Sequence, residues 1–294
     1  MSIALAKHYS TCILSADSRQ FYKELSIGTA KPDTEEQNGV QHYFIDSHSI
    51  QDEVSSARYA KEALEVLEQE FQTKDVIILV GGSGMFIDAL CIGLDSIPSS
   101  PELRMQIQQE YETNGLSPLL DELQQNDETY YAEVDRQNPM RIIRAIEVIR
   151  LTGKPFSSQR TSVVQDRPFE THRFVIQHDR ERLYERINLR VDMMMDAGLL
   201  AEVESVIQHR ELTSLNTVGY KELFEYLDGA ISREQAIELI KRNSRRYAKR
   251  QLTWFKRHPE SIWIDYAENN TMVDEIVTYM DVKITANEPT ENLE

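Results

Sequence analysis

The amino-acid sequence predicts an α/β fold, a parallel sheet flanked by helices, together with an α-helical insertion domain. Strand-like and helix-like segments alternate through residues 1–98 and again through 166–282, which together predict the α/β core. Residues 99–165 contain helical patterns only, so we expect them to form the insertion. The remaining residues, 283–294, are polar and predict a frayed tail.

The first part of the core predicts two strands and three helices. The run DVIILVGG at 75–82 is continuously apolar and ends in glycines, which is typical of a parallel strand buried on both faces. Residues 53–72 space their apolar side chains as a helix does. The other predicted elements here are a short helix Ser2–His8, a buried strand at Cys12–Leu14 and a helix at 85–94.

The rest of the chain predicts helices and two further strands. Gly198 has the position of a residue that ends a helix. The predicted insertion helices are 101–115, 116–126, 127–135 and 139–153. The later predicted elements are a strand at 173–179, helices at 181–198 and 199–211, a glycine turn at 216–222, a basic helix at 241–258 and a strand at 261–265.

Composition indicates a globular protein of the cytoplasm. Hydrophobic residues make up 40% of the chain, which is ample for a buried core. The two cysteines, Cys12 and Cys91, adjoin apolar runs and predict buried thiols rather than a disulfide framework. The sequence has no apolar run long enough to cross a membrane and no secretion signal. We therefore expect a cytoplasmic location.

Charge is distributed unevenly along the chain. The net charge of −17 argues against a nucleic-acid partner, but residues 241–258 hold eight Lys or Arg and no acid. Local fields rather than the average attract a polyanion. This segment therefore predicts either a nucleic-acid contact or a solvated helix face.

Polar residues follow the strand at Cys12–Leu14. Asp17 comes just after the carboxyl end of this strand, where α/β proteins bind ligands. Its neighbours Ser15, Ser18, Arg19 and Gln20 all form hydrogen bonds readily. Asp17 is a candidate general base or a metal ligand through water. The alternative is that it caps the start of a helix.

The segment Gly81–Gly84, of sequence GGSG, follows the second predicted strand. Such glycines let backbone amides approach a ligand closely. A tight strand-to-helix turn explains them equally well. Neither this segment nor TGKP at Thr152–Pro155 matches the phosphate loop pattern, because the required Lys-Ser or Lys-Thr is absent.

Two cationic surfaces are predicted further along. Arg141 and Arg144 share a helix face and can clamp phosphates, although Arg144 can instead pair with Glu147. In the basic helix, the cations lie on one stripe and the apolar side chains on another. The cationic stripe consists of Arg242, Arg246, Lys249 and Lys256 together with Thr253. The apolar stripe consists of Ile240, Tyr247 and Trp254. Lys221 adds a further cation after the glycine turn.

Six collinear segments resemble the tRNA dimethylallyltransferase family, also called isopentenyl-diphosphate:tRNA transferases. They cover nearly the whole chain and keep the family's order. The matching segments are SADSRQFY…IGTAKP at 15–32, VGGSGMF at 80–86, NPMRIIRAIEV at 138–148, TGKP at 152–155, NTVGYKE at 216–222 and AKRQLTWF at 248–255.

The resemblance implies transfer of a dimethylallyl group from its diphosphate to N6 of the adenosine 3′-adjacent to the anticodon, assisted by Mg²⁺. It implies that Asp17 is the catalytic base and that Ser83, where the family usually has Thr, keeps a catalytic hydroxyl. The adenine amine needs a base because its lone pair is delocalised. The implied partners are the tRNA anticodon stem-loop and dimethylallyl diphosphate, and a monomer is expected.

The resemblance also implies the residues that contact tRNA. Met140 replaces the family's usual Gln, and Lys221 stands where many members have Arg. Lys221 is also the expected contact to the donor diphosphate. The implied tRNA-binding residues are Asp17, Ser18, Arg19, Gln20, Ser83, Arg104, Met140, Arg141, Ile142, Ile143, Arg144, Lys221, Arg246, Lys249 and Arg250.

The sequence departs from the family at its start. The family's P-loop-NTPase-like sheet begins with a strand and a G-P-T-x-x-G-K-T loop, and neither occurs in these 294 residues. We expect the strands that flank this first strand to lack a hydrogen-bond partner, and the chain as written to be destabilised and inactive. Three interpretations stay open: a truncated or wrongly started transferase, a non-catalytic tRNA-binding paralogue, and an adenylate (free nucleotide) isopentenyltransferase.

Overall fold

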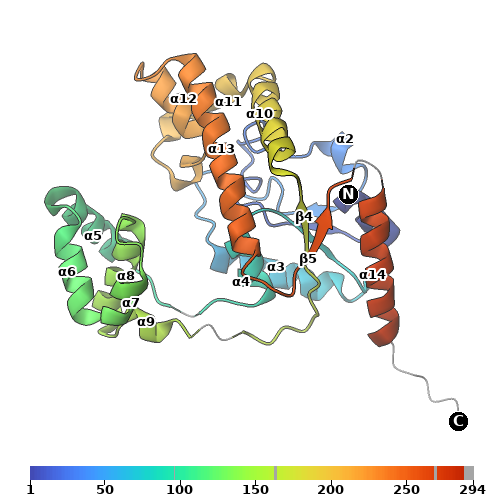
Figure 1. Cartoon of the computed structure of the whole chain (residues 1–294), viewed down its shortest axis with the longest axis horizontal. Helices are drawn as coiled ribbons and strands as arrows, with labels where there is room; N and C mark the ends of the chain where they lie inside the picture. Colours follow the sequence, from blue (N-terminus) through green and yellow to red (C-terminus); the bar gives the residue numbers. More distant parts are fainter. Residues whose placement is uncertain (96, 162–163, 268–269, 288–294) are drawn as a thin grey trace, which may run out of the picture. The chain divides into compact units, whose positions relative to one another are not determined.

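The computed structural model divides the chain into two compact units. It describes residues 1–95, 97–161, 164–267 and 270–287. Unit 1 comprises Met1–Cys91 and Pro168–Glu294, and unit 2 comprises Ile92–Arg167. The predicted insertion at 99–165 thus corresponds to a helical unit that begins a few residues earlier in the structure and ends a few residues later (Figure 1).

Unit 1 alternates helices and strands, as the sequence predicts. Its amino-terminal elements are α1 (Ser2–His8), β1 (Ile13–Ser15), α2 (Thr34–Gln37), β2 (His42–Tyr43), α3 (Ser56–Glu70), β3 (Ile78–Val80) and α4 (Gly84–Cys91). Its later elements are β4 (Phe174–Gln177), α10 (Arg180–Asp196), α11 (Leu199–Ser205), the short 3₁₀ helices Ile207–His209 and Thr213–Leu215, α12 (Tyr220–Leu227), α13 (Arg233–Phe255), β5 (Ile262–Asp265) and α14 (Thr271–Asn287).

The first sheet of unit 1 has three parallel strands in the order β2-β1-β3. Leu14 of β1 pairs with Tyr43 on one side and Leu79 on the other. All three residues of β1 are buried because this central strand has neighbours on both edges and helices on both faces. The carboxyl ends of β1 and β3 meet at one edge of the sheet, which brings the loops after them together.

A second sheet consists of β4 and β5 alone, which also pair in parallel. Within the described residues, the expected parallel sheet is therefore divided in two, and the facing edges of β3 and β4 have no strand between them. The prediction that the DVIILVGG strand is buried on both faces is wrong. Ile78 and Leu79 are only half-buried and Val80 is exposed, because the outer edge of β3 borders a cavity.

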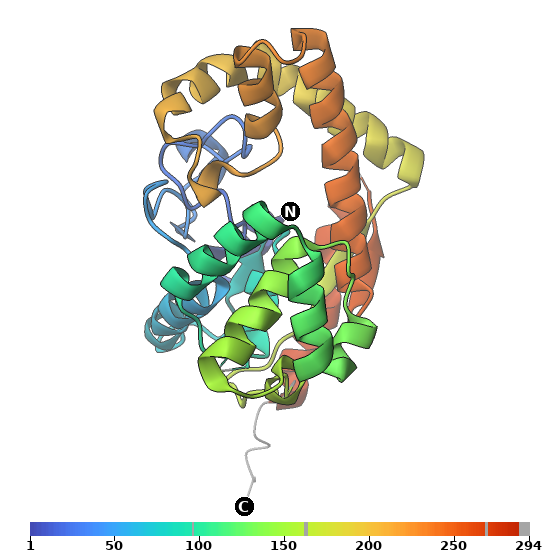
Figure 2. The same ribbon diagram turned by 90° about the vertical axis from the view of Figure 1, so that its left-hand side faces the viewer.

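Helices α10 to α13 pack together on one core of unit 1 (Figure 2). Its centre includes Val191 of α10, Leu199 of α11, Leu223 of α12 and Ile240 of α13. Ser232 begins α13: its Oγ accepts a hydrogen bond from the Gln235 backbone N–H, and Gln235 Oε1 accepts one from the Ser232 backbone N–H. The helix is longer than predicted, since its acidic first turns precede the basic segment.

Unit 2 consists of helices around a separate apolar core. Its elements are α5 (Pro101–Asn114), α6 (Ser117–Asn126), α7 (Glu128–Glu133), α8 (Pro139–Thr152) and α9 (Phe156–Gln159). Helix α8 lies at the centre, and its Ile142, Ile146 and Ile149 pack with Ile107 and Leu123. Pro139 occupies the first turn of α8, where it leaves no N–H unpaired, and Asn138 caps that turn.

The prediction of a frayed tail from residue 283 is wrong for its first residues. Helix α14 continues to Asn287, and Lys283 lies over the ring of Tyr279 in that helix. The apolar side of α14, through Met272 and Ile276, packs on Leu5 and Ile264. The rest of the predicted tail, residues 288–294, lies outside the described residues.

Candidate active site

The loop after β1 and the loop after β3 meet through two serines. Ser83 Oγ accepts a hydrogen bond from the Ser18 backbone N–H at 3.0 Å and lies 3.0 Å from Ser18 Oγ. Asp17 precedes Ser18 in the loop after β1, and its carboxylate accepts a hydrogen bond from the Arg19 backbone N–H at 2.9 Å. No helix follows Asp17, so the helix-cap alternative is wrong and the carboxylate stabilises a turn instead. Asp17 remains partly accessible to a ligand.

The GGSG segment is held by close packing. A Cβ on Gly81 would lie 2.4 Å from the carbonyl carbon of Ala16, so no larger residue fits without moving the backbone. Gly84 is equally constrained, because a Cβ there would lie 2.3 Å from the Trp254 ring. These contacts support the interpretation as a tight strand-to-helix turn, which in turn fixes the position of Ser83.

The loop at residues 26–30 lies next to the loops that carry Asp17 and Ser83. Gln20 donates from Nε2 to the carbonyls of Thr29 and Ala30, both at 3.3 Å. Its Oε1 lies 3.4 Å from Ser15 Oγ. The amide of Gln20 is thus used to hold this loop beside Asp17, and Arg19 is similarly bound to the carbonyls of Thr213 and Ser214.

Glu202 of α11 holds the same loop in place. Its carboxylate accepts hydrogen bonds from the backbone N–H groups of Ser26, Ile27 and Gly28 at 2.7–2.9 Å. Tyr220 donates its hydroxyl to Glu202 at 2.6 Å, and burial together with the Glu202 charge raises the pKa of Tyr220. Tyr220 therefore stays a neutral donor, and the Glu202 carboxylate accepts four hydrogen bonds, three of them from the loop.

Arg190 on α10 is a site residue that the sequence analysis missed. Partial removal from water lowers the pKa of Arg190, and the nearby negative charge of Asp17 opposes this shift. Its Nη2 lies 3.4 Å from the Thr29 carbonyl. Arg190 is classed as exposed although it follows the half-buried Ile187 by three positions, so helical spacing alone did not indicate its place at the site.

The carboxyl-terminal half of α13 packs on the GGSG segment and α4. Gln251 donates to the Gly82 carbonyl at 2.8 Å. Asp88 of α4 accepts hydrogen bonds from Trp254 Nε1 at 2.7 Å and Arg173 at 2.9 Å, with His258 Nε2 at 3.2 Å. This buried cluster attaches the basic helix rigidly beside the loop that carries Ser83.

The predicted cations of α13 point to solvent. Arg246, Lys249 and Arg250 are exposed, and Arg250 lies over the ring of Tyr247. Tyr247 itself is 42% exposed, so its assignment to the packed side of the helix is wrong. Lys221 is exposed in the first turn of α12, and within the described ranges its side chain has no hydrogen bond or ion pair to the Asp17 loop.

In unit 2, the predicted RNA contacts divide into two kinds. Met140 and Arg141 are exposed at the first turn of α8. Ile142 and Ile143 are 0% and 1% exposed, so their side chains are not on the surface, and their assignment to tRNA binding stays a prediction. Both lie in the helical core, since they occupy the apolar side of α8.

Arg104 and Arg144 converge on one buried carboxylate. Glu147 accepts from Arg104 Nε at 3.0 Å, from Arg144 Nη1 at 2.9 Å and from the Ser100 N–H at 2.8 Å. The salt-bridge alternative for Arg144 is therefore present in the structure. The side chains of Arg104 and Arg144 remain partly exposed, at 38% and 30%.

Two general findings concern metals and membranes. Among the described residues, no group of three or more His, Cys, Asp or Glu side chains is arranged to hold a metal ion. None of the helices in the described ranges is both long and apolar enough to cross a membrane.

Comparison with known proteins identifies the family to which this chain belongs. The family model described as IPP transferase matches residues 20–258. The chain belongs to the IPP transferase family. The tRNA dimethylallyltransferase of Cytophaga hutchinsonii is 47% identical over 285 residues, covering 97% of this chain and 92% of that protein. A tRNA dimethylallyltransferase of Bacteroides thetaiotaomicron is 48% identical, with 95% and 90% covered.

Solved IPP transferase structures share the fold. The full-length tRNA isopentenylpyrophosphate transferase of Bacillus halodurans superimposes with a TM-score of 0.71 at 33% identity, covering 97% of this chain and 92% of that one. A eukaryotic dimethylallyltransferase acting on tRNA gives a TM-score of 0.80 at 22% identity, with 99% and 77% covered, and bears on the fold alone. The α/β fold with a parallel sheet flanked by helices is thereby confirmed.

Proposed function

We propose that this chain serves in tRNA modification, by transfer of a dimethylallyl group from dimethylallyl diphosphate to N6 of the adenosine 3′-adjacent to the anticodon. The observation that carries the proposal is the meeting of the Asp17–Ser18 loop with Ser83 at the carboxyl ends of β1 and β3. Membership of the IPP transferase family and relatives named tRNA dimethylallyltransferase support the same reaction.

Asp17 is the proposed base. The exocyclic amine of adenine is a weak nucleophile, so its proton must be removed as the bond from nitrogen to carbon forms. Asp17 is a partly accessible carboxylate fixed by the Arg19 N–H, with its remaining lone pairs free to accept the amine proton. The adenosine must leave the stacked anticodon loop to reach it.

The leaving diphosphate needs positive charge and hydrogen-bond donors. Arg190, beside Asp17, and the hydroxyl of Ser83 are the candidates for this task within unit 1. Mg²⁺ fits the oxygen-rich set formed by Asp17, Ser18 and Ser83, and it would neutralise diphosphate charge when bound. Lys221, the cation expected from the sequence to meet the donor, remains a proposal.

Exposed cations supply the proposed contacts with the tRNA backbone. In unit 1 these are Arg246, Lys249 and Arg250 on α13, and in unit 2 Arg141 with the partly exposed Arg104 and Arg144. Such contacts give affinity through phosphate neutralisation rather than base reading. Separate cationic faces explain how a chain of net charge −17 can bind RNA.

The test measures transfer of label from radiolabelled dimethylallyl diphosphate to unmodified tRNA. Two forms are assayed: the chain as written, and a fusion with an upstream strand and G-x-x-x-x-G-K-T loop. We expect little or no turnover by the first form, because its sequence has no phosphate loop, and rescue in the second. In the rescued form, Asp17→Asn should lower kcat by about 10²-fold or more with little change in tRNA affinity.

Asp121→Asn, a change at an exposed residue of α6, is the matched control and should leave the rate unchanged. A rescued Asp17→Asn enzyme that keeps near-full rate contradicts the assignment of the base. Tight tRNA binding without transfer by either form favours the non-catalytic paralogue. Faster labelling of AMP than of tRNA favours the nucleotide isopentenyltransferase.

A further inference from the structure

Ser83 lies between two glycines that are both in close contact with α13. A Cβ on Gly82 would collide with Nε2 of Gln251. A Cβ on Gly84 would collide with the ring of Trp254. The carboxyl-terminal end of α13 passes α4 at this point (Figure 1). Because glycine has no side chain, α13 can approach the GGSG backbone closely on both sides of Ser83.

Gln251 also binds the GGSG segment through a hydrogen bond. Its Nε2 donates to the Gly82 carbonyl at 2.8 Å, one residue before Ser83. The Gln251 side chain is half-buried, and a carbonyl turned away from water needs a donor of this kind. The bond therefore holds the backbone that directly precedes Ser83.

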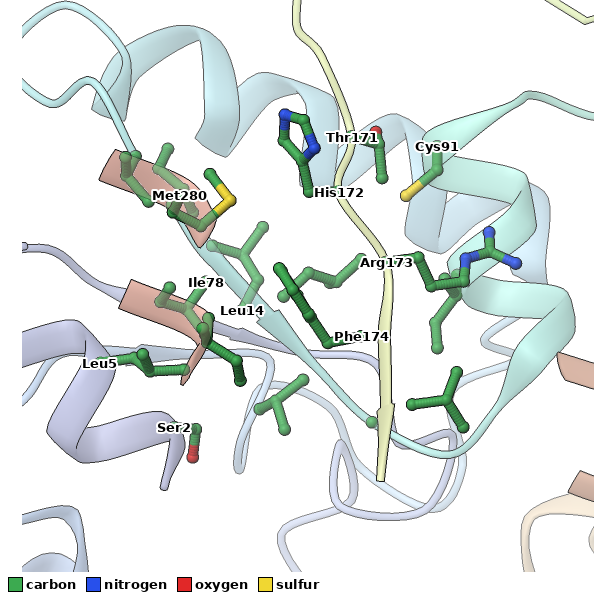
Figure 3. A pocket seen from close by; sticks show the side chains of 18 of the residues that line it. Ser2, Leu5, Leu14, Ile78, Cys91, Thr171, His172, Arg173, Phe174 and Met280 are labelled. Atoms are coloured by element: carbon green, nitrogen blue, oxygen red, sulfur yellow. The ribbon is translucent and has the colours of Figure 1, made fainter. Parts of the chain in front are cut away.

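Trp254, on the other side of Ser83, is held in turn by Asp88 of α4. Trp254 Nε1 donates to Asp88 Oδ2 at 2.7 Å. Asp88 is buried, and it also accepts from Arg173 Nη2 at 2.9 Å and lies 3.2 Å from His258 Nε2. Figure 3 shows the Arg173 side chain extending from the β4 segment toward α4. The carboxylate thus fixes the indole ring against Gly84.

The position of Ser83 matters because its hydroxyl meets the loop that carries Asp17. Ser83 Oγ accepts a hydrogen bond from the Ser18 backbone N–H at 3.0 Å. Within the described ranges, this N–H has no other acceptor. Hydrogen bonds weaken steeply when donor and acceptor separate or lose their alignment. A shift of the Ser83 backbone would therefore release the Ser18 N–H.

We propose that Gln251 and Trp254 are positioning residues for Ser83, and that Asp88 acts on Ser83 through Trp254. Gln251 and Trp254 hold the hydroxyl through the glycines on either side of it. Their role rests on the proposed function, in which Ser83 offers a hydroxyl to the leaving diphosphate. The side of α13 that faces the GGSG segment then has a task different from that of the exposed cations on the same helix.

The alternative is that the sheet holds Ser83 without help from α13. The Ala16 N–H donates to the Val80 carbonyl at 2.7 Å, and the Ser83 N–H donates to the Ala16 carbonyl at 3.2 Å. These bonds attach the GGSG segment to the end of β1 only. The two explanations therefore differ in the effect that they predict for changes in α13.

The first test reads amide hydrogen exchange at Ser18 in the full chain by NMR. Ser83→Ala removes the acceptor and defines the rate of the released amide. Gln251→Glu keeps the side-chain size but places a carboxylate oxygen against the Gly82 carbonyl, which breaks the hydrogen bond. We expect about tenfold faster exchange at Ser18 in this variant. Gln69→Glu, at an exposed position of α3, is the matched control and should keep the parent rate.

The pH dependence of the same variant separates positioning from a loss of packing. In Gln251→Glu, the introduced carboxyl lies half-buried beside a carbonyl, so its pKa should lie above the usual value. Once protonated, it can donate to the Gly82 carbonyl as the amide does. Protection of the Ser18 amide, corrected for the intrinsic exchange rate, should therefore recover between pH 7 and about pH 5. A defect in packing would not recover.

Trp254→Phe tests the link to Asp88. It keeps an aromatic ring but removes the donor to Asp88, and Ser18 should exchange about threefold faster or more. The charge of α13 is unchanged, so tRNA affinity, measured by filter retention, should stay within about twofold of the parent chain. If the parent chain does not bind tRNA, the proposed function fails, while exchange at Ser18 still decides whether α13 positions Ser83.

Parent exchange rates at Ser18 in both Gln251→Glu and Trp254→Phe would overturn the proposal, because the sheet would then hold Ser83 by itself. An unchanged rate in Ser83→Ala would overturn it too, since Ser18 would not depend on that hydroxyl. The buried Leu14 amide of β1 should stay slow in every variant, and an equal rise there would mean general loosening and also contradict positioning. If Trp254→Phe fails to fold by circular dichroism, Gln251→Glu and its pH dependence decide the question.

Discussion

At the scale of single residues, position in the sequence marked the Asp17 loop as a candidate site but did not reveal which residues contact this loop. Asp17 was predictable because acids after a parallel strand lie where ligands bind. The contacts of Gln20 and Glu202 with the loop at 26–30 were not, since they join residues far apart in the chain. The burial of Ile142 and Ile143 was not evident from the motif match either, because such a match does not say which side of a helix is buried.

Glu147 provides a residue-scale prediction about pH. Burial raises its pKa, but hydrogen bonds from Arg104, Arg144 and the Ser100 N–H outweigh this and leave the pKa of Glu147 below its usual value. The ionised form therefore stabilises unit 2 above the unfolded pKa of about 4.3, and this stabilisation is lost as pH falls through the folded value. Glu147→Gln should lower the free energy of unfolding by about 2 kcal/mol at pH 7.

The measurement is urea denaturation of both proteins between pH 7 and pH 3. The difference in stability between them should shrink as the pH falls, since protonation removes the charged hydrogen bonds from the native chain too. Glu128→Gln, at an exposed position of α7, is the control and should show no such difference. A gap that stays constant over this range would contradict the role of the charge.

At the scale of elements, hydrophobic spacing located the helices well. The predicted helix at 53–72 contains α3, and Pro139 begins α8 as expected. Strand burial was predicted less well, because β3 has an open edge that no local pattern reveals. The basic helix was found from its charge, while its attachment through Asp88, Trp254 and Gln251 depends on tertiary contacts.

Helix α13 provides the prediction at this scale. Replacing Arg246 and Lys249 together by Gln should weaken tRNA binding about tenfold at low salt, because two exposed phosphate contacts are lost. The slope of log K against log salt should become shallower by about 1.5. Binding is measured by filter retention over a salt series.

Lys61→Gln is the control, as Lys61 is an exposed cation on α3 outside the proposed RNA surface. It should alter neither affinity nor slope. An unchanged slope in the double variant would mean that these two side chains do not meet phosphate, and the solvated-face alternative for α13 would then hold.

At the scale of the whole molecule, the chain consists of two units with separate cores. Unit 2 buries Ile107, Leu123, Ile142 and Ile146 in a core of its own, so we expect it to fold without the sheets. The change from alternating to purely helical patterns revealed this division in the sequence. Its boundaries at Ile92 and Arg167 fall outside the predicted 99–165, because extended segments at both ends belong to the helical unit.

An isolated fragment of residues 92–167 should fold alone. We expect a helical circular dichroism spectrum and a cooperative thermal transition, with a free energy of unfolding of roughly 3–5 kcal/mol, typical of a small single core. Ile146→Ala should lower that value by about 2–4 kcal/mol and serves as the core control. A broad, non-cooperative transition in the unsubstituted fragment would show that unit 2 depends on unit 1.

The sequence by itself determined the α/β class, the helical insertion, the Asp17 loop and the basic helix, because periodicity, turn residues and charge runs are local signals. Tertiary structure alone decided that Arg190 reaches the Thr29 carbonyl, that Arg104 and Arg144 share Glu147, and that the sheet is divided in two. These features depend on which distant segments meet. A strand edge is paired or open according to its neighbour in space, and no pattern within the strand encodes that neighbour.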